Sequence, residues 1–404
     1  MKRNLYWILL VACSIASIMA CTTNTSSEKW SVRMAQSEMK RFPEPWMIEK
    51  AKKPRWGYTH ALVVKSMLEE CKHTGDSTYY HYAKIYADSL IDSNGRIKTM
   101  KYLSFNIDNV NGGKILFDLY KQTGEARYKV AMDTLRKQMA EQPRTTEGGF
   151  WHKLKYTHQM WLDGIFMASP YLAQYGATFN EPALFDEVVK QILLIKEKTY
   201  DATTGLYYHG WDESHEQKWS NPQTGCSPNF WSRSIGWYGA AIVDVLDYLP
   251  LETAGRDNVL QTLQDLTKSL VNYQDEKSGT WYQVTDQGAR PGNYLESSAT
   301  ALFIYTLAKS INRGYISTDY IPAVKKAFDG MIETFIRQEA NGTYTITNCC
   351  AVAGLGGNAN KYRDGSFEYY ISEPVIENDP KSVGSFILAA IEYEKLINNI
   401  KLNP

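Results

Sequence analysis

The segment QMWLDGIFM at residues 159–167 places one carboxylic acid, Asp163, among large apolar side chains. A carboxylate removed from water is costly unless it is paired or protonated. We therefore expect these neighbours to favour the protonated form of Asp163, which would let it act as a general acid. The structural alternative is that Asp163 caps the N-terminus of a helix that starts here, since Asp commonly takes that position. The two roles are compatible.

A second acid, Asp108 in SFNIDNVNGGK, lies 55 residues earlier and also precedes a predicted helix. Its neighbours are Asn106, Asn109 and Asn111 rather than apolar residues. We therefore expect Asp108 to stay ionised, helped by the positive end of its helix. Two acids in contrasting surroundings are typical of general acid and base duties, as in glycoside hydrolysis. A plain helix cap is again the alternative, and it is the stronger one for Asp108.

Aromatic and cationic side chains elsewhere supply candidates for a sugar-binding surface. Aromatic residues make up 13% of the chain, with 28 Tyr and 11 Trp, and such rings stack well on sugar faces. Arg233 in FWSRSIGWY could clamp an acidic substrate with two N–H donors, or it could pair with a structural carboxylate. Trp237 lies inside a predicted helix, so packing in the core is a close alternative to sugar contact. The candidate binding residues are Tyr58, His152, Trp161, His209, Trp231, Arg233, Trp237 and Tyr369.

The elements that must position these residues are helices. Apolar residues recur every three or four positions in twelve segments, which predicts an all-α protein. One turn recurs, with Gly75 and Gly124 lying 49 residues apart and Gly176 in a looser third copy. Glycine suits the left-handed residue after a helix end, so we expect tandem helical hairpins. The predicted helices are 29–41, 57–73, 77–92, 109–123, 126–141, 161–175, 181–199, 234–249, 256–274, 296–312, 318–338 and 382–399.

Three long connections, 200–230, 278–294 and 339–380, are polar and aromatic, and they contain strand-like pieces such as GLYYHGW and GTYTIT. We expect the hairpins to close into a double ring with these loops at one mouth; an open superhelix is the alternative. If adjacent hairpins stack in register, Asp108 and Asp163 reach the same end. Because no linker or composition shift divides the chain, residues 28–404 are predicted to form one domain.

The chain begins with a positively charged start and a 16-residue apolar run that ends before Cys21. This pattern is typical of a bacterial lipoprotein, with residues 1–20 as the signal peptide, Cys21 as the lipidated N-terminus and residues 21–27 as a tether. Cys13 also fits the pattern, but cleavage there would leave too short an apolar stretch. We expect an exported protein that is anchored in the periplasm or at the cell surface through its lipid alone.

Charge and cysteine usage argue against two other classes of function. Lys plus Arg and Asp plus Glu number 44 each, and no basic stripe is present, so the sequence argues against nucleic-acid binding. Cys349 and Cys350 lack partners at zinc-ligand spacing, which predicts no metal site. We interpret the cysteines beyond Cys21 as small buried hydrophobes, with one disulfide as the alternative.

Taken together, NIDNVNGGK, HQMWLDGIFM, YHGWD, FWSRSIGWY and AVAGLGG followed by DGSFEYYISEP resemble the unsaturated rhamnogalacturonyl hydrolases, glycoside hydrolase family 105, over nearly the whole mature chain. The resemblance implies an (α/α)6 barrel of six helical hairpins without a cofactor. It also implies hydration of the C4=C5 double bond that a polysaccharide lyase leaves on a non-reducing uronate. In that reaction Asp163 would be the general acid and base, Asp108 would assist or bind the sugar, and Trp231, Arg233, Trp237 and His209 would line the site.

The substrate expected from this resemblance is an unsaturated rhamnogalacturonan disaccharide derived from pectin. The related family 88 acts on glycosaminoglycan and gellan products, and products of ulvan or arabinogalactan lyases are further alternatives. A glycan-capturing lipoprotein without catalysis and an ordinary inverting glycosidase on saturated sugars are the competing functions. In the last of these, Asp108 and Asp163 would act as base and acid.

Overall fold

The computed structural model describes residues 29–357 and 362–402, so the predicted signal peptide, Cys21 and the tether lie outside the described residues. All twelve predicted helices are present, with ends within a few residues of those expected. They are α2 (Trp30–Arg41), α3 (Tyr58–Thr74), α4 (Ser77–Leu90), α6 (Lys114–Thr123) with the short α5 (Asp108–Asn111) before it, α7 (Ala126–Ala140), α8 (Leu162–Phe179), α9 (Ala183–Thr199), α10 (Ser232–Leu246), α11 (Arg256–Asn272), α12 (Ser297–Asn312), α13 (Ile321–Phe335) and α15 (Pro380–Leu402).

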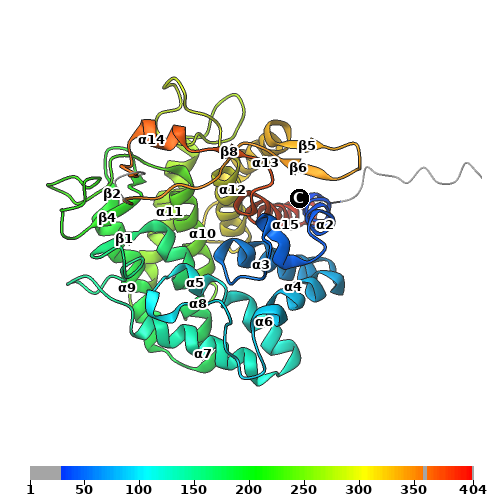
Figure 1. Ribbon diagram of the computed structural model, residues 1–404. Helices are drawn as coiled ribbons and strands as arrows, with labels where there is room; N and C mark the ends of the chain where they lie inside the picture. Colours follow the sequence, from blue (N-terminus) through cyan, green and yellow to red (C-terminus); the bar gives the residue numbers. More distant parts are fainter. Residues whose placement is uncertain (1–28, 358–361, 403–404) are drawn as a thin grey trace, which may run out of the picture.

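The helices form two concentric rings (Figure 1). In the inner ring, α3, the α5–α6 pair, α8, α10, α12 and α15 contact one another in that order, and α15 returns to α3. The outer helices α2, α4, α7, α9, α11 and α13 pack against the inner helices next to them in the chain. The predicted (α/α)6 barrel of helical hairpins is therefore confirmed, and the ring is closed.

Burial along the helices explains which of them lie inside. In α12 every residue from Ser297 to Ile311 is buried, as expected for a helix surrounded by other helices. In the outer helix α11 the buried residues recur at helical spacing on one face, including Val259, Leu263, Leu266 and Leu270. Apolar periodicity thus predicts both kinds of helix. The width of the apolar face determines whether a helix lies in the inner or the outer ring.

The inner helices run parallel, because ends of the same polarity meet. At the starts of α12 and α15, the hydroxyls of Ser297 and Ser382 lie 2.8 Å apart. Toward the ends of α10 and α12, Lys309 Nζ lies 2.5 Å from Asp244 Oδ1. The barrel therefore has an N-terminal mouth, where the inner helices begin, and a C-terminal mouth, where they end.

The recurring glycine turn is confirmed twice and fails once. Gly75 and Gly124 follow α3 and α6 in the left-handed conformation, with φ of 79° and 68°. Gly176 instead lies within α8, and Asn180 takes the left-handed position with φ of 58°. Asn tolerates this conformation better than most side chains, so the helix continues past the glycine to the next suitable residue.

Short antiparallel strand pairs lie in the loops. The strands are β1 (Gln159–Trp161), β2 (Tyr200–Asp201), β3 (Leu206–Tyr207), β4 (Gly210–Asp212), β5 (Ile336–Gln338), β6 (Tyr344–Ile346), β7 (Cys349–Cys350) and β8 (Val375–Ile376). They pair as β1–β4, β2–β3, β5–β6 and β7–β8. The predicted strand-like pieces contain β3, β4 and β6, whereas β1 and the short helix α14 (Phe367–Ser372) were not predicted.

Within residues 29–357 and 362–402, no helix combines the length and apolarity needed to cross a membrane. The same residues include no group of three or more His, Cys, Asp or Glu side chains placed to hold a metal ion. Cys71, Cys226, Cys349 and Cys350 are free, and all but Cys71 are buried. The cysteines therefore pack as small side chains, in line with the first interpretation of the sequence.

Candidate active site

The pairing of β1 with β4 positions Asp163. Trp161 pairs with Gly210, and a Cβ on Gly210 would lie 2.9 Å from Trp161 Cδ1, so the close approach favours glycine. The Leu162 N–H then donates to the His209 carbonyl at 3.1 Å, where α8 begins. Asp163 therefore lies in the first turn of α8, and Trp161 occupies the N-cap. The interpretation of Asp163 as the cap is wrong, because the unpredicted strand β1 runs to Trp161 and α8 begins at Leu162.

The carboxyl of Asp163 faces a buried histidine. His209 Nε2 lies 3.2 Å from Asp163 Oδ2, and His209 is fully buried. Although these atoms are close, neither has a partner in hydrogen-bond geometry among the described residues. On the other side of the ring, His209 Nδ1 lies 2.8 Å from the hydroxyl of Tyr370. Because the Asp163 side chain remains 15% exposed, it can reach a bound molecule while His209 supports it from behind.

Flat aromatic rings surround this pair. Trp161 stacks on His152 with a centroid distance of 4.6 Å and on Tyr156 at 4.7 Å. Trp231 stacks on Tyr370 at 5.9 Å and lies 4.7 Å from the ring of His209. His152, His209 and Trp231 are almost completely buried, so they form the layer behind the surface that a ligand would touch.

Asp108 is held by two bases. Its Oδ2 accepts a hydrogen bond from Lys153 Nζ at 2.6 Å, and its Oδ1 lies 3.3 Å from His152 Nε2. Burial acts to raise the pKa of Asp108, but Lys153 and His152 outweigh it and hold the pKa well below its usual range. Asp108 is therefore ionised, as the sequence predicts, and Lys153 is the main cause of its lowered pKa. The N-cap of α5 is Ile107, so the interpretation of Asp108 as a helix cap is also wrong.

Arg233 is buried beneath the N-terminal mouth. Its Nη1 donates to the carbonyl of Cys350 and to Ser298 Oγ, and it lies 3.8 Å from Glu296 Oε1. Arg233 Nη1 therefore fits the alternative in which Arg233 pairs with a structural carboxylate, here that of Glu296. Arg233 Nε, in contrast, is buried and has no hydrogen-bond partner in the part of the chain that the structure describes.

Trp237 does not line the cleft. It is 1% exposed and packs against Phe166 in the hydrophobic core, with ring centroids 4.6 Å apart. Its position one turn into α10 points it at the barrel interior, because α10 is buried on all sides. The prediction that Trp237 contacts sugar is therefore wrong, and the alternative of core packing holds.

Two tyrosines among the predicted residues are partly exposed. Tyr58 begins α3 at the N-terminal mouth, and burial, with Asp108 nearby, raises the pKa of its phenol. The Tyr369 hydroxyl accepts a hydrogen bond from the Gly354 N–H at 3.0 Å. Tyr58 and Tyr369 thus join Asp108 and Asp163 as groups that a ligand can touch.

Sequence reasoning missed the roles of Lys153, Tyr370 and Glu296. Lys153 and Tyr370 follow His152 and Tyr369 directly, so the motifs contained a signal, but the neighbouring residue was chosen. Glu296 is fully buried and caps α12 by accepting a hydrogen bond from the Ala299 N–H at 2.7 Å. It also accepts from the Cys350 N–H at 2.9 Å, and so fixes the segment that holds Arg233.

An open groove of about 470 Å³ reaches Lys153, the partner of Asp108. Its lining residues are Thr99, Lys101, Ser104, Asn106, Asn109, Lys153, Leu154 and Lys155. The site as a whole therefore offers an ionised carboxylate held by bases, a second carboxyl with an underused oxygen, and an adjoining polar groove. Such a combination can donate a proton at one point and stabilise positive charge at another.

Comparisons with known proteins agree with this geometry. The family model described as Glycosyl Hydrolase Family 88 matches residues 30–397. The structure of a family 105 glycoside hydrolase from C. acetobutylicum ATCC 824 is 39% identical, has a TM-score of 0.87, and covers 91% of this chain and 100% of its own. Protein Atu3128 of Agrobacterium fabrum is 36% identical over 233 residues, 56% of this chain and 97% of its own length. Unsaturated rhamnogalacturonyl hydrolase YesR of Bacillus subtilis is 25% identical over 272 residues, 66% of this chain and 73% of its own.

Proposed function

The chain belongs to glycosyl hydrolase family 88, and we propose that it hydrates the C4=C5 double bond of an unsaturated uronate at the non-reducing end of lyase-generated oligosaccharides. Hydration would release the adjoining sugar. The observation that carries the proposal is the contrast between the two acids. Asp108 is ionised and paired with Lys153 and His152, whereas Asp163 Oδ2 lacks a hydrogen-bond partner among the described residues and leaves its carboxyl available for proton transfer.

Asp163 would act twice in this reaction. Its proton goes to C4 of the uronate, which leaves positive charge at C5 shared with the ring oxygen. The resulting Asp163 carboxylate accepts a proton from water as the water oxygen bonds to C5, so the group returns to its starting state. The product is a hemiketal at C5, which opens, and the adjoining sugar departs. His209, at 3.2 Å, supports the negative charge on Asp163 between the two steps.

Asp108 would supply fixed negative charge near the developing cation. Its low pKa means that it remains a carboxylate while Asp163 gains and loses a proton. A charge that is already in place needs no rearrangement as the transition state forms, which is the basis of electrostatic catalysis. The two acids therefore have separate duties, and Lys153 maintains the separation by keeping Asp108 ionised.

We propose an unsaturated rhamnogalacturonan disaccharide derived from pectin as the substrate, in keeping with the name of the YesR relative. The groove beside Asp108 favours a second candidate, because Lys101, Lys153 and Lys155 all line it. Because Lys153 is already paired with Asp108, Lys101 and Lys155 are the cations that suit a second sugar with negative charge, such as a sulfate in an ulvan lyase product. Relative kcat/KM on the two unsaturated disaccharides decides between these substrates.

The deciding experiment follows the ultraviolet absorbance of the conjugated double bond in lyase-digested rhamnogalacturonan. We expect the intact protein to remove this absorbance and to leave the saturated disaccharide uncleaved, and we expect Asp163→Asn to lose the activity. A glycan-binding protein would leave the absorbance constant, and an inverting glycosidase would cleave the saturated sugar. Constant absorbance with products of several lyases would overturn the proposal.

We also propose that the protein is a lipoprotein anchored through Cys21, as the sequence pattern predicts. Metabolic labelling with a clickable fatty acid tests this directly. Intact protein should carry the label and sediment with membranes, whereas Cys21→Ala should carry none. Equal labelling of the two proteins would contradict the proposed anchor.

A further inference from the structure

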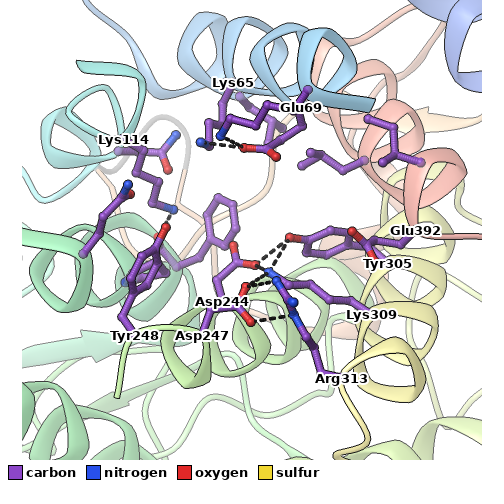
Figure 2. A pocket seen from close by; sticks show the side chains of 18 of the residues that line it. Lys65, Glu69, Lys114, Asp244, Asp247, Tyr248, Tyr305, Lys309, Arg313 and Glu392 are labelled. Carbon is purple, nitrogen blue, oxygen red and sulfur yellow. Dashed lines mark hydrogen bonds and ion pairs between the residues drawn. The ribbon is translucent and has the colours of Figure 1, made fainter. Parts of the chain in front are cut away.

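A separate polar cavity lies on the barrel axis between the inner helices, on the side of the C-terminal mouth. It holds about 240 Å³ and is lined by Lys65, Lys114, Asp244, Tyr305, Lys309 and Glu392, among others. We call this space the axial cavity (Figure 2). Its volume far exceeds the ~10–15 Å³ that one water needs, and it is somewhat smaller than the ~300 Å³ at which drug-sized sites begin. The axial cavity is therefore of a size for a small organic molecule.

Almost every cation around the axial cavity has its own carboxylate. Lys309 Nζ, for example, lies 2.5 Å from Asp244 Oδ1 and 2.9 Å from Asp247 Oδ2. The other lining cations with a carboxylate partner are Lys65, Lys72, Arg313 and Lys395. Lys114 is almost completely buried, with 6% of its surface exposed. Among the residues that the structure describes, it nevertheless forms no ion pair with a carboxylate. One buried amine is thus left without a carboxylate partner.

Part of the role of Lys114 is structural. Pro170 lies inside α8 and has no N–H, so the carbonyl of Phe166, four residues earlier, loses its helical donor. Lys114 Nζ replaces that donor with a hydrogen bond of 2.6 Å to the Phe166 carbonyl. A neutral amine would serve this purpose as well as an ammonium. The backbone contact therefore explains why a donor is present, but it gives the charged form of Lys114 no anionic partner.

Two further features point from Lys114 into the axial cavity. In Figure 2 its side chain extends into the space between Lys65 and Glu69 on one side and Asp244 and Lys309 on the other. Asn111, one turn earlier on the same inner helix pair, also lines the cavity and is 2% exposed. Its Nδ2 donates to the Tyr58 carbonyl, whereas its Oδ1 has no hydrogen-bond partner within the described ranges. The inner end of the cavity thus presents an unpaired ammonium and an unused acceptor.

We propose that the axial cavity binds a small hydroxylated monocarboxylate, such as an open-chain sugar acid. Its carboxylate accepts hydrogen bonds from the Lys114 ammonium, and one of its hydroxyls donates to Asn111 Oδ1. One negative charge matches the one unpaired cation, and the hydroxyl matches the acceptor, whereas a plain inorganic anion would satisfy only the first. Binding in the axial cavity is independent of the hydration reaction proposed for Asp163.

Binding of the anion should also be accompanied by uptake of a proton by Lys114. Burial lowers the pKa of Lys114 to about 7, with Asp244 opposing and Lys65 and Lys309 adding to the effect. Binding a carboxylate requires the charged form, so affinity should fall as the pH rises above about 7. The charged and titratable groups that face Lys114 from the other helices and their ends are Lys65, Glu69, Lys72, Asp244, Asp247, Tyr248, Tyr305, Lys309, Arg313, Glu392 and Lys395.

Isothermal titration calorimetry with sodium gluconate tests the proposal on the full-length protein. Sorbitol serves as the neutral analogue and nitrate as the monovalent anion that carries no hydroxyl. We expect gluconate to bind at least tenfold more tightly than either, with net proton uptake at pH 8 that appears as a dependence on the buffer. Lys114→Met should weaken binding at least tenfold and remove the proton uptake. Lys84→Met, on an outer helix and paired with Asp88, should bind as the parent does.

Because Lys114→Met leaves the Phe166 carbonyl without its donor, the same measurement is made on Lys114→Met combined with Pro170→Ala. The second change returns a backbone N–H to α8, so the double variant should fold even where the single variant does not. The proposal is overturned if gluconate fails to bind, if sorbitol or nitrate binds as tightly, or if either folded Lys114 variant binds gluconate as the parent does.

Discussion

The two mouths of the barrel both carry acids and bases, but they use them differently. At the C-terminal mouth Lys65 Nζ lies 2.7 Å from Glu69 Oε1 and 2.8 Å from Asp118 Oδ2, so each charge has a close partner. At the N-terminal mouth Asp163 has only His209, at 3.2 Å and outside hydrogen-bond geometry, among the described residues. Counting charges would not distinguish the two ends. Incomplete pairing of a carboxyl does, because the acids around the axial cavity are paired and Lys114, which has no carboxylate partner there, is a base. A buried polar atom left unsatisfied in a native protein calls for an explanation such as catalysis.

Helix dipoles explain why each mouth has the charges it has. Asp108 and Asp163 lie in the first turns of α5 and α8, where the positive end of the dipole favours a carboxylate. Lys309 and Arg313 lie at the end of α12, where the negative end favours a cation. The parallel inner helices therefore favour Asp108 and Asp163 at one end and Lys309 and Arg313 at the other. Charges of the opposite sign are also present at each end, and local pairing decides which end can react.

The sharpest test exchanges one carboxyl at each mouth for its amide. Asp163→Asn should lower kcat by about a thousandfold, the range expected when a general acid is lost, while the melting temperature stays unchanged. Asp118→Asn should keep kcat but lower the free energy of unfolding by about 2 kcal/mol, because it breaks half-buried pairs with Lys65 and Lys72. Steady-state kinetics and urea unfolding measure the two effects. Loss of activity in folded Asp118→Asn would erase the distinction between the mouths.

Lys153→Met should give a smaller loss, about a hundredfold in kcat/KM, because it removes the partner that holds Asp108 ionised. In the parent, the depressed pKa of Asp108 means that its stabilising charge is complete above the unfolded value and is lost only as the pH falls through the folded value. Without Lys153, the burial of Asp108 is no longer outweighed, so its pKa should rise. The acid limb of the pH–rate profile should move to higher pH.

Lys153→Arg provides the control for this variant, because it keeps a positive charge beside Asp108 although the guanidinium differs in shape from the ammonium. It should restore the acid limb and most of the activity. A profile that is identical in the Met and Arg variants would show that Lys153 acts on the sugar rather than on Asp108.

A third test concerns the hydrogen bond between Lys114 and the Phe166 carbonyl. Lys114→Met should lower the free energy of unfolding by about 1 kcal/mol more in the parent than in Pro170→Ala, where the backbone regains its own donor. The benefit of removing a buried charge is common to both backgrounds and cancels in the cycle. Chemical denaturation of the four proteins gives the coupling energy. A coupling near zero would mean that the Lys114 donor does not replace the missing proline amide.

The sequence was sufficient for the helices and insufficient for the contacts between their loops. Apolar periodicity is a property of each segment alone, so the helices could be predicted without knowledge of their neighbours. The strand β1 has three residues and pairs with β4 some fifty residues later, so nothing local announces it. That pairing carries His209 to Asp163 and also decides that Asp163 does not cap its helix. Asp163 and His209 could each be found in the sequence, but the contact between them could not.

Neighbouring residues in a motif are hard to separate for a related reason. Tyr369 and Tyr370 share the short helix α14, and one step along a helix turns the side chain by about 100°. Tyr370 therefore points at His209 and is fully buried, whereas Tyr369 is partly exposed. Likewise, the motif FWSRSIGWY contains Trp237 but does not show where its side chain points. The burial of α10 on every side places it in the core. The motif therefore locates the site to within a residue, and the packing of the helices determines which side chain faces the site.

The smallest expected effect is that of Tyr370→Phe, which removes the hydroxyl 2.8 Å from His209 Nδ1 and leaves the ring in place. If that hydroxyl donates to Nδ1, then His209 carries its proton on Nε2, toward Asp163, and the hydroxyl selects the tautomer that supports a carboxylate. Losing one such hydrogen bond, worth about 1 kcal/mol, should lower kcat by about fivefold. KM should not change, because Tyr370 is fully buried and does not reach the substrate. A raised KM with unchanged kcat would instead place Tyr370 in contact with the sugar, and the N-terminal mouth would then recognise its substrate through a residue that the present geometry assigns to support.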